Sequence, residues 1–223
     1  MNDTVRTGRL ILVPALITLA VTALRLVGEL MHWSPRFFSR EAGGAGAIVG
    51  IVWLVPIFGM YFARKLVAAG LGPAGAGRAL GMAVLGLAFV PAAIGLATAM
   101  KLSFMAVLPI LAVVSLAGAF VAYRGWPALG RVLGAYGLAA RIPVALLMAV
   151  AMMANWGTHY ELGPPNLPAM GLFTKWVAIG LVPQLTFWIG FTMMMGAIFG
   201  SVAAMIGGRA RSGGPALAPA GRA

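Results

Sequence analysis

Long runs of apolar residues fill most of the chain, and polar residues gather in short stretches between them. The runs cover residues 10–30, 45–63, 80–100, 102–123, 138–156 and 173–206. Each is close to or longer than the roughly 20 residues that a helix needs to cross about 30 Å of hydrocarbon. The pattern predicts an all-α, polytopic transmembrane bundle of six spans formed by residues 1–208. Residues 209–223, rich in Gly, Pro and Ala, are predicted to be a disordered cytoplasmic tail.

The last apolar run is longer than one crossing needs, and Pro183 lies inside it. Proline removes a backbone donor and kinks a helix. We favour an interfacial piece that is separated at Pro183 from the true span. A single long helix that begins outside the membrane stays open as the other interpretation.

Two parts of the chain resemble each other. Trp33 is followed by a polar loop and by Leu-Val-Pro ending at Pro56, and Trp156 is followed by a polar loop and by Leu-Val-Pro ending at Pro183. One interpretation is a duplicated hairpin, in which helices 1–2 and 5–6 form a parallel repeat. The other is chance recurrence in a biased composition.

The composition supports a membrane protein. Hydrophobic residues make up 61% of the chain and charged residues 9%, against about 45–50% and about 25% in soluble domains. The chain has no cysteine, which excludes disulfides, thiolate metal sites and a cysteine nucleophile. We expect the lipid bilayer to be its main partner.

The formal net charge of +12 reports orientation rather than nucleic-acid binding, because the basic residues are scattered over short loops. With six spans, four Lys and Arg fall outside and Arg25 falls within a helix. This bias predicts a protein of the cell inner membrane with both termini in the cytoplasm. The eleven basic residues assigned to the inside are Arg6, Arg9, Arg64, Lys65, Arg78, Arg124, Arg131, Arg141, Arg209, Arg211 and Arg222.

Arg25 and Glu29 are four residues apart in the first span and therefore share a helix face. Ionisable residues at this depth usually face protein or water. His32 lies one turn further on, so that Glu29-x-x-His32 has a spacing also found in metal-binding bundles. Three interpretations are open: a self-neutralising ion pair, a site for a solute or proton, and a metal site. We favour the ion pair and assign no metal.

A second polar cluster, residues 155–161, follows the fifth run and contains His159 and Glu161. If helices 1 and 5 are neighbours, His32 and His159 border one external vestibule. Gln184 follows Pro183 in the last run, and polar groups beside a helix break line binding sites in transporters. The competing interpretation of residues 155–161 is an ordinary ordered loop.

The sequence indicates the function less directly than it indicates the topology. We predict a small-solute or ion transporter, or its membrane component, with a site on the outer half between helices 1, 5 and 6. The alternative is a non-catalytic subunit of a larger membrane complex. With four acidic residues in total, we expect no enzyme and no cofactor. The stripe of Gly196, Gly200 and Ala204 predicts a contact face for a neighbouring helix, a second copy or a membrane partner.

Overall fold

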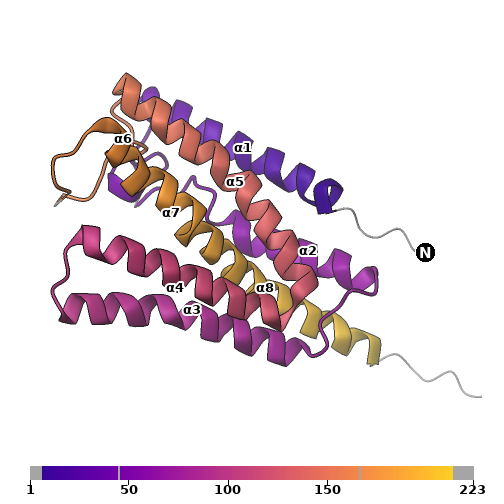
Figure 1. The fold of residues 1–223 in the computed structure, drawn as a ribbon. Coiled ribbons are helices and arrows are strands. Elements are labelled where there is room, and N and C mark those ends of the chain that lie inside the picture. Colours follow the sequence, from indigo (N-terminus) through magenta and orange to yellow (C-terminus); the bar gives the residue numbers. More distant parts are fainter. Residues whose placement is uncertain (1–6, 45, 166, 213–223) are drawn as a thin grey trace, which may run out of the picture.

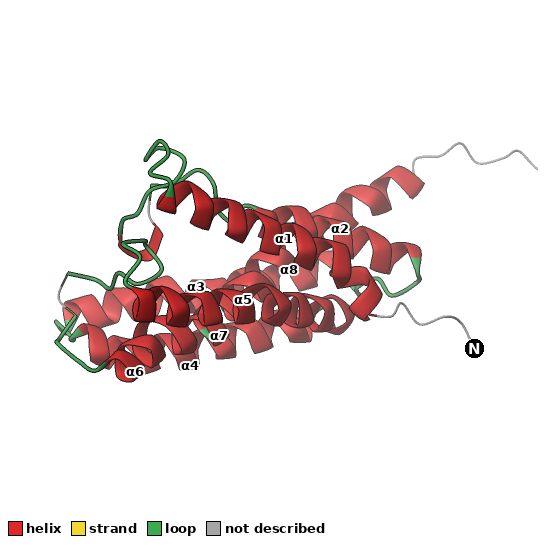
Figure 2. Ribbon diagram, turned by 90° about the horizontal axis from the view of Figure 1, so that it is seen from above, coloured by secondary structure: helices red, strands yellow, loops and turns green. Residues whose placement is uncertain are grey.

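The computed structural model describes residues 7–44, 46–165 and 167–212. Within these residues the chain forms helices joined by loops and no strand, as Figure 2 shows. The elements in chain order are α1 (Thr7–Leu30), η1 (Ala42–Gly44), α2 (Leu54–Ala68), α3 (Ala76–Ala99), α4 (Phe104–Gly125), α5 (Pro127–Ala154), α6 (Leu172–Lys175), η2 (Trp176–Leu181), α7 (Val182–Leu185) and α8 (Phe187–Ser212).

Five helical stretches are long and apolar enough to cross a membrane: α1, α3, α4, α5 and the run Leu172–Gly207 that joins α6 to α8. The predicted all-α character is therefore confirmed for the described residues, and the five helical stretches fit the predicted multi-pass membrane protein. Six spans are not established, because α2 has 15 residues and covers only about 23 Å at 1.5 Å per residue.

The prediction of one helical span over residues 45–63 is wrong in its first half. The described residues between η1 and α2 form bends and turns, and helix begins only at Leu54. Gly43, Gly44 and Gly46 all have positive φ, which glycine adopts without steric cost. The carbonyls of Ser39 and Gly44 accept from the Arg25 guanidinium, each at 3.1 Å, so that this segment is held against α1.

The helices pack along one common direction (Figure 1). α1 and α5 lie side by side and run the same way, α3 and α4 form a tight hairpin, and α8 contacts α2, α3, α4 and α5. The beginning of α1 and the end of α8 lie at the same end of the bundle (Figure 1). We call this the terminal end, and the opposite end, where α1 and α5 finish, the loop end.

The core at the terminal end is built from aromatic and leucine side chains. Phe58 and Phe62 of α2 both pack edge-on against Tyr136 of α5, at centroid distances of 5.5 Å. The Tyr136 hydroxyl lies 2.7 Å from the Thr18 hydroxyl and joins α5 to α1. This bond satisfies two buried polar groups that would otherwise be costly in an apolar surrounding.

The small-residue stripe of α8 packs inside the chain. Gly196 and Gly200 are buried, and a Cβ added to Gly59 of α2 would lie 2.5 Å from the Gly196 carbonyl oxygen. A Cβ at Gly200 would meet Leu129 of α5 and the Gly59 carbonyl oxygen. The neighbouring helix predicted for this stripe is thus α2, with α5 beside it. Assembly with a second copy or a membrane partner through Gly196, Gly200 and Ala204 stays a prediction, and the two glycines offer it no exposed surface.

The two predicted hairpins differ in structure. The first pairs α1 with a short α2 that follows an irregular segment, whereas the second pairs α5 with the nearly continuous run from α6 to α8. The first Leu-Val-Pro begins a helix, and the second lies within a helical run. The duplication is not confirmed. α8 continues to Ser212, and residues 213–223, which make up most of the tail predicted to begin at residue 209, lie outside the described part.

Candidate functional site

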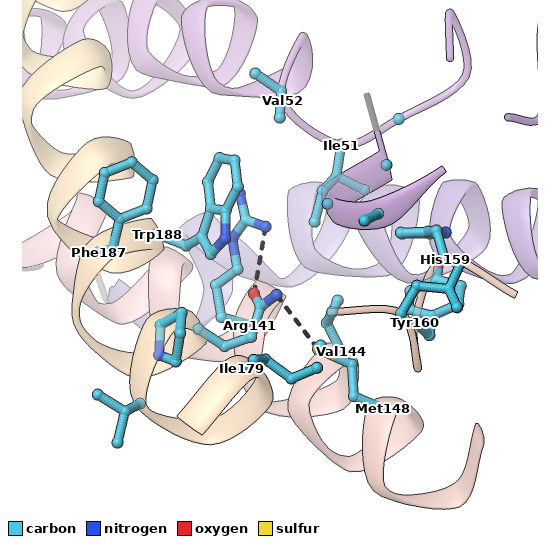
Figure 3. A pocket seen from close by; sticks show the side chains of 18 of the residues that line it. Ile51, Val52, Arg141, Val144, Met148, His159, Tyr160, Ile179, Phe187 and Trp188 are labelled. Atoms are coloured by element: carbon cyan, nitrogen blue, oxygen red, sulfur yellow. Dashed lines mark hydrogen bonds between the residues drawn. The ribbon is translucent and has the colours of Figure 1, made fainter. Parts of the chain in front are cut away.

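A cavity of about 570 Å³, here called the central cavity, lies between α1, the segment 42–53, α4, α5 and the run 179–188. Its volume falls within the range of about 300–1,000 Å³ typical of small-molecule sites. Figure 3 shows part of its lining, which is mostly apolar with a few polar groups. The polar lining residues are Thr22, Arg25, Arg141, His159, Tyr160, Gln184 and Thr186.

Arg25 and Glu29 pair as their spacing predicts. Arg25 Nε donates to Glu29 Oε1 at 2.8 Å, and the Glu29 side chain is fully buried. Arg25 lines the cavity, whereas Glu29 lies behind it. Because its Nη2 also donates to the Ser39 and Gly44 carbonyls, Arg25 fixes both its counter-ion and the irregular segment that covers it.

His159 joins the same cluster from the loop after α5. Its backbone N–H donates to Glu29 Oε2 at 2.9 Å, and its ring Nδ1 lies 2.5 Å from Glu29 Oε1. Since the carboxylate accepts, Nδ1 is the protonated ring nitrogen that faces it. Arg25 Nε and the backbone and ring N–H groups of His159 thus donate to the same buried carboxylate of Glu29. These bonds attach the loop after α5 to α1.

Glu161 has a structural place in that loop. Its carboxylate accepts from the backbone N–H of Trp156 at 2.9 Å and from that of Gly157, just after the left-handed Asn155 that ends α5. Glu161 is buried and does not line the cavity. It binds the loop's own backbone, as in the ordinary ordered loop named as the competing interpretation.

His32 is exposed and lies outside the cavity lining. Its Nε2 lies 2.8 Å from Arg40 Nη1, and its Nδ1 lies 2.9 Å from the Leu30 carbonyl. Of the two histidines predicted to border one vestibule, His159 lines the cavity and His32 does not. Within the described residues, no group of three His, Asp or Glu side chains lies close enough to hold a metal ion.

The middle of the cavity holds Arg141, which the charge pattern counted among the basic residues of the inside. It lies halfway along α5 and is 4% exposed. Its Nη1 donates to Gln184 Oε1 at 3.5 Å, and its guanidinium lies 4.6 Å from the centre of the Trp188 ring (Figure 3). The available signal was that Arg141 falls inside the apolar run 138–156, where a charge marks a functional position by default.

The helix that carries Gln184 is irregular where it lines the cavity. A π-helical stretch covers Trp176–Leu181, Pro183 follows, and Thr186 departs from regular helical dihedrals at φ −115° and ψ −72°. The Thr186 hydroxyl donates to the Val182 carbonyl at 2.7 Å. The predicted break near Pro183 is present, but it lies within one long helical run and beside the cavity, where π-turns often mark functional sites.

His159 predicts a pH-dependent stability. Burial lowers the pKa of its imidazole, and the nearby Arg25 charge lowers it further, although the hydrogen bond to Glu29 acts the other way. Unfolded histidine titrates near 6.5, so below that pH the unfolded state binds more protons than the folded one. The melting temperature should therefore fall as pH drops from 7 toward 5.5.

His159→Gln should flatten that pH dependence, as measured by thermal unfolding in detergent. His32→Gln is the matched control, because His32 is exposed and lies outside the Glu29 cluster; its variant should keep the wild-type slope. Equal slopes for wild type and His159→Gln would show that another group carries the dependence.

No protein-family model, no curated protein and no solved structure matches this chain.

Proposed function

We propose that this protein is a membrane carrier, or the membrane component of one, that binds a small solute in the central cavity. The observation that carries the proposal is the cavity itself, which reaches Arg25 and Gln184 between α1, α5 and the run from α6 to α8. A non-catalytic subunit has no need for such a cavity, and a solid bundle would have supported that alternative. The proposed role is to bind the solute and let it cross the membrane, without catalysing a reaction.

We also propose that the protein lies in the inner membrane with its terminal end facing the cytoplasm. Arg9, Arg64, Lys65, Arg78 and Arg124 belong to helix ends at the terminal end, whereas Lys101 and Lys175 belong to the loop end. Moving Arg141 into the bundle leaves ten basic residues inside against four outside, and the bias still favours this orientation.

Cysteine accessibility tests the carrier proposal. The chain has no native cysteine, so Val144→Cys, in the cavity wall, reports on that wall alone. Leu133→Cys is the matched control, because Leu133 is on the same helix, is 0% exposed and lies outside the lining. A charged, membrane-impermeant thiol reagent should modify Val144→Cys in sealed vesicles and leave Leu133→Cys unmodified.

The side of the vesicle from which the reagent reaches the introduced cysteine distinguishes the competing functions. Modification of Val144→Cys by reagent added to either side of the vesicle supports a carrier that opens alternately. Modification from one side only would contradict transport and leave a binding subunit. No modification from either side would contradict a water-accessible cavity and favour the non-catalytic subunit.

A further inference from the structure

The charges on the cavity wall do not balance. Two arginines, Arg25 and Arg141, line the central cavity, and its described lining contains no aspartate or glutamate. Arg25 is neutralised by Glu29 from behind the wall. Arg141 has no acidic partner among the described residues, and its burial in the bundle removes it from water as well.

Arg141 is also short of hydrogen-bond partners. A guanidinium carries five N–H donors, and the one hydrogen bond that Arg141 makes to a described residue is the 3.5 Å contact with Gln184. Its Nε is buried without a partner. The Trp188 ring face, 4.6 Å from the guanidinium, favours the cation but accepts no conventional hydrogen bond. An unpaired buried charge of this kind is costly unless a counter-ion is supplied.

The rest of the cavity suits an apolar body. Beside Arg141 the wall is formed by Val144, Met148, Ile179 and Phe187. Val52 and Ile94 also line it, with 37% and 44% of their surface exposed. An apolar chain can therefore occupy the space beside the guanidinium.

We propose that the central cavity binds an amphiphilic organic anion, whose carboxylate or phosphate pairs with Arg141 while its apolar body fills the remaining volume. This inference rests on the proposed carrier function and specifies its substrate class. Guanidinium binds such anions through two parallel N–H···O bonds. The Gln184 amide, whose Nε2 meets only the Met148 sulfur at 3.6 Å, is placed to donate a further bond.

The test measures ligand-induced thermal stabilisation in nanodiscs of phosphatidylcholine. Octanoate in the aqueous phase is the first probe, and dioleoyl phosphatidic acid in the disc is the second, because the same anionic chemistry can come from a free solute or from a lipid. Octanol, octylamine and acetate are the comparators. Octanoate or phosphatidic acid should raise the melting temperature saturably, and the comparators should not match it.

Arg141→Gln should weaken the response to the effective probe at least about tenfold, the expected loss of a charge-assisted hydrogen bond. Arg141→Lys should retain part of it, since the charge remains. Response to octanoate alone assigns a soluble solute, and response to phosphatidic acid alone assigns a membrane lipid; both support the proposal. Equal responses to octanol, an octanoate response unaffected by Arg141→Gln, or no response to either anion would overturn it.

Different results would contradict the carrier proposal and the anion proposal. If Val144→Cys reacts from both sides but neither anion binds, the carrier proposal stands and the anionic substrate is wrong. If Val144→Cys reacts from one side only while octanoate stabilises through Arg141, the anion site stands and transport is wrong.

Discussion

Replacing Glu29 with glutamine should lower the free energy of unfolding by about 3–5 kcal/mol, the usual cost of removing one partner from a buried ion pair. Glu29 is fully buried and accepts from Arg25 Nε and from the backbone and ring of His159. The substituted amide would leave the Arg25 charge without its counter-ion and offer a single acceptor oxygen to three donors. Urea or thermal unfolding in one detergent measures the loss.

Glu41→Gln is the control, since Glu41 is exposed and its carboxylate makes no ion pair with a described residue. The double variant Arg25→Gln with Glu29→Gln should recover part of the loss, because it removes both charges together. A Glu29→Gln protein as stable as Glu41→Gln would mean that the cluster does not hold α1, the segment 39–44 and the loop after α5 together.

The second large effect is expected at the crossing of α3 and α4. A Cβ added to Gly86 would lie less than 3 Å from the backbone of Gly118, and the reverse holds as well. Backbone cannot move aside as a side chain can, so Gly86→Ala should separate the two helices and cost about 1–3 kcal/mol. The melting temperature in detergent provides the measurement.

Gly81 and Gly95 on the same helix are matched controls, because a Cβ at either meets nothing within 4 Å. Gly81→Ala and Gly95→Ala should be neutral or slightly stabilising. If Gly86→Ala melts together with these two variants, the close approach of α3 and α4 is wrong.

Uniform apolar runs made most of the helices predictable. α1, α3, α4 and α5 each contain one long run, and a segment of about 20 apolar residues has few alternatives in a bilayer. The same uniformity hid the irregular segment that precedes α2. Residues 47–53 are as apolar as a helix interior. The chain before them contains glycines with positive φ, and Arg25 holds it through the Ser39 and Gly44 carbonyls.

The site was predictable only where sequence spacing is short. Arg25 and Glu29 are one turn apart, so their pairing follows from helix geometry. The bond from His159 to Glu29 spans 130 residues, and only the packing of α1 against α5 creates it. Arg141 is the one charged residue in the apolar run 138–156, and its position in the sequence does not indicate which other helices surround it.

The shortness of α2 bears on how the protein is made. At 15 residues, α2 is too short to be a stable membrane anchor by itself, and it packs mainly against α8, with Gly59 close to the Gly196 backbone. α8 follows α2 by more than a hundred residues in the chain and therefore leaves the ribosome much later. We therefore expect insertion in two stages, in which α2 reaches its final position only after α8 has been made.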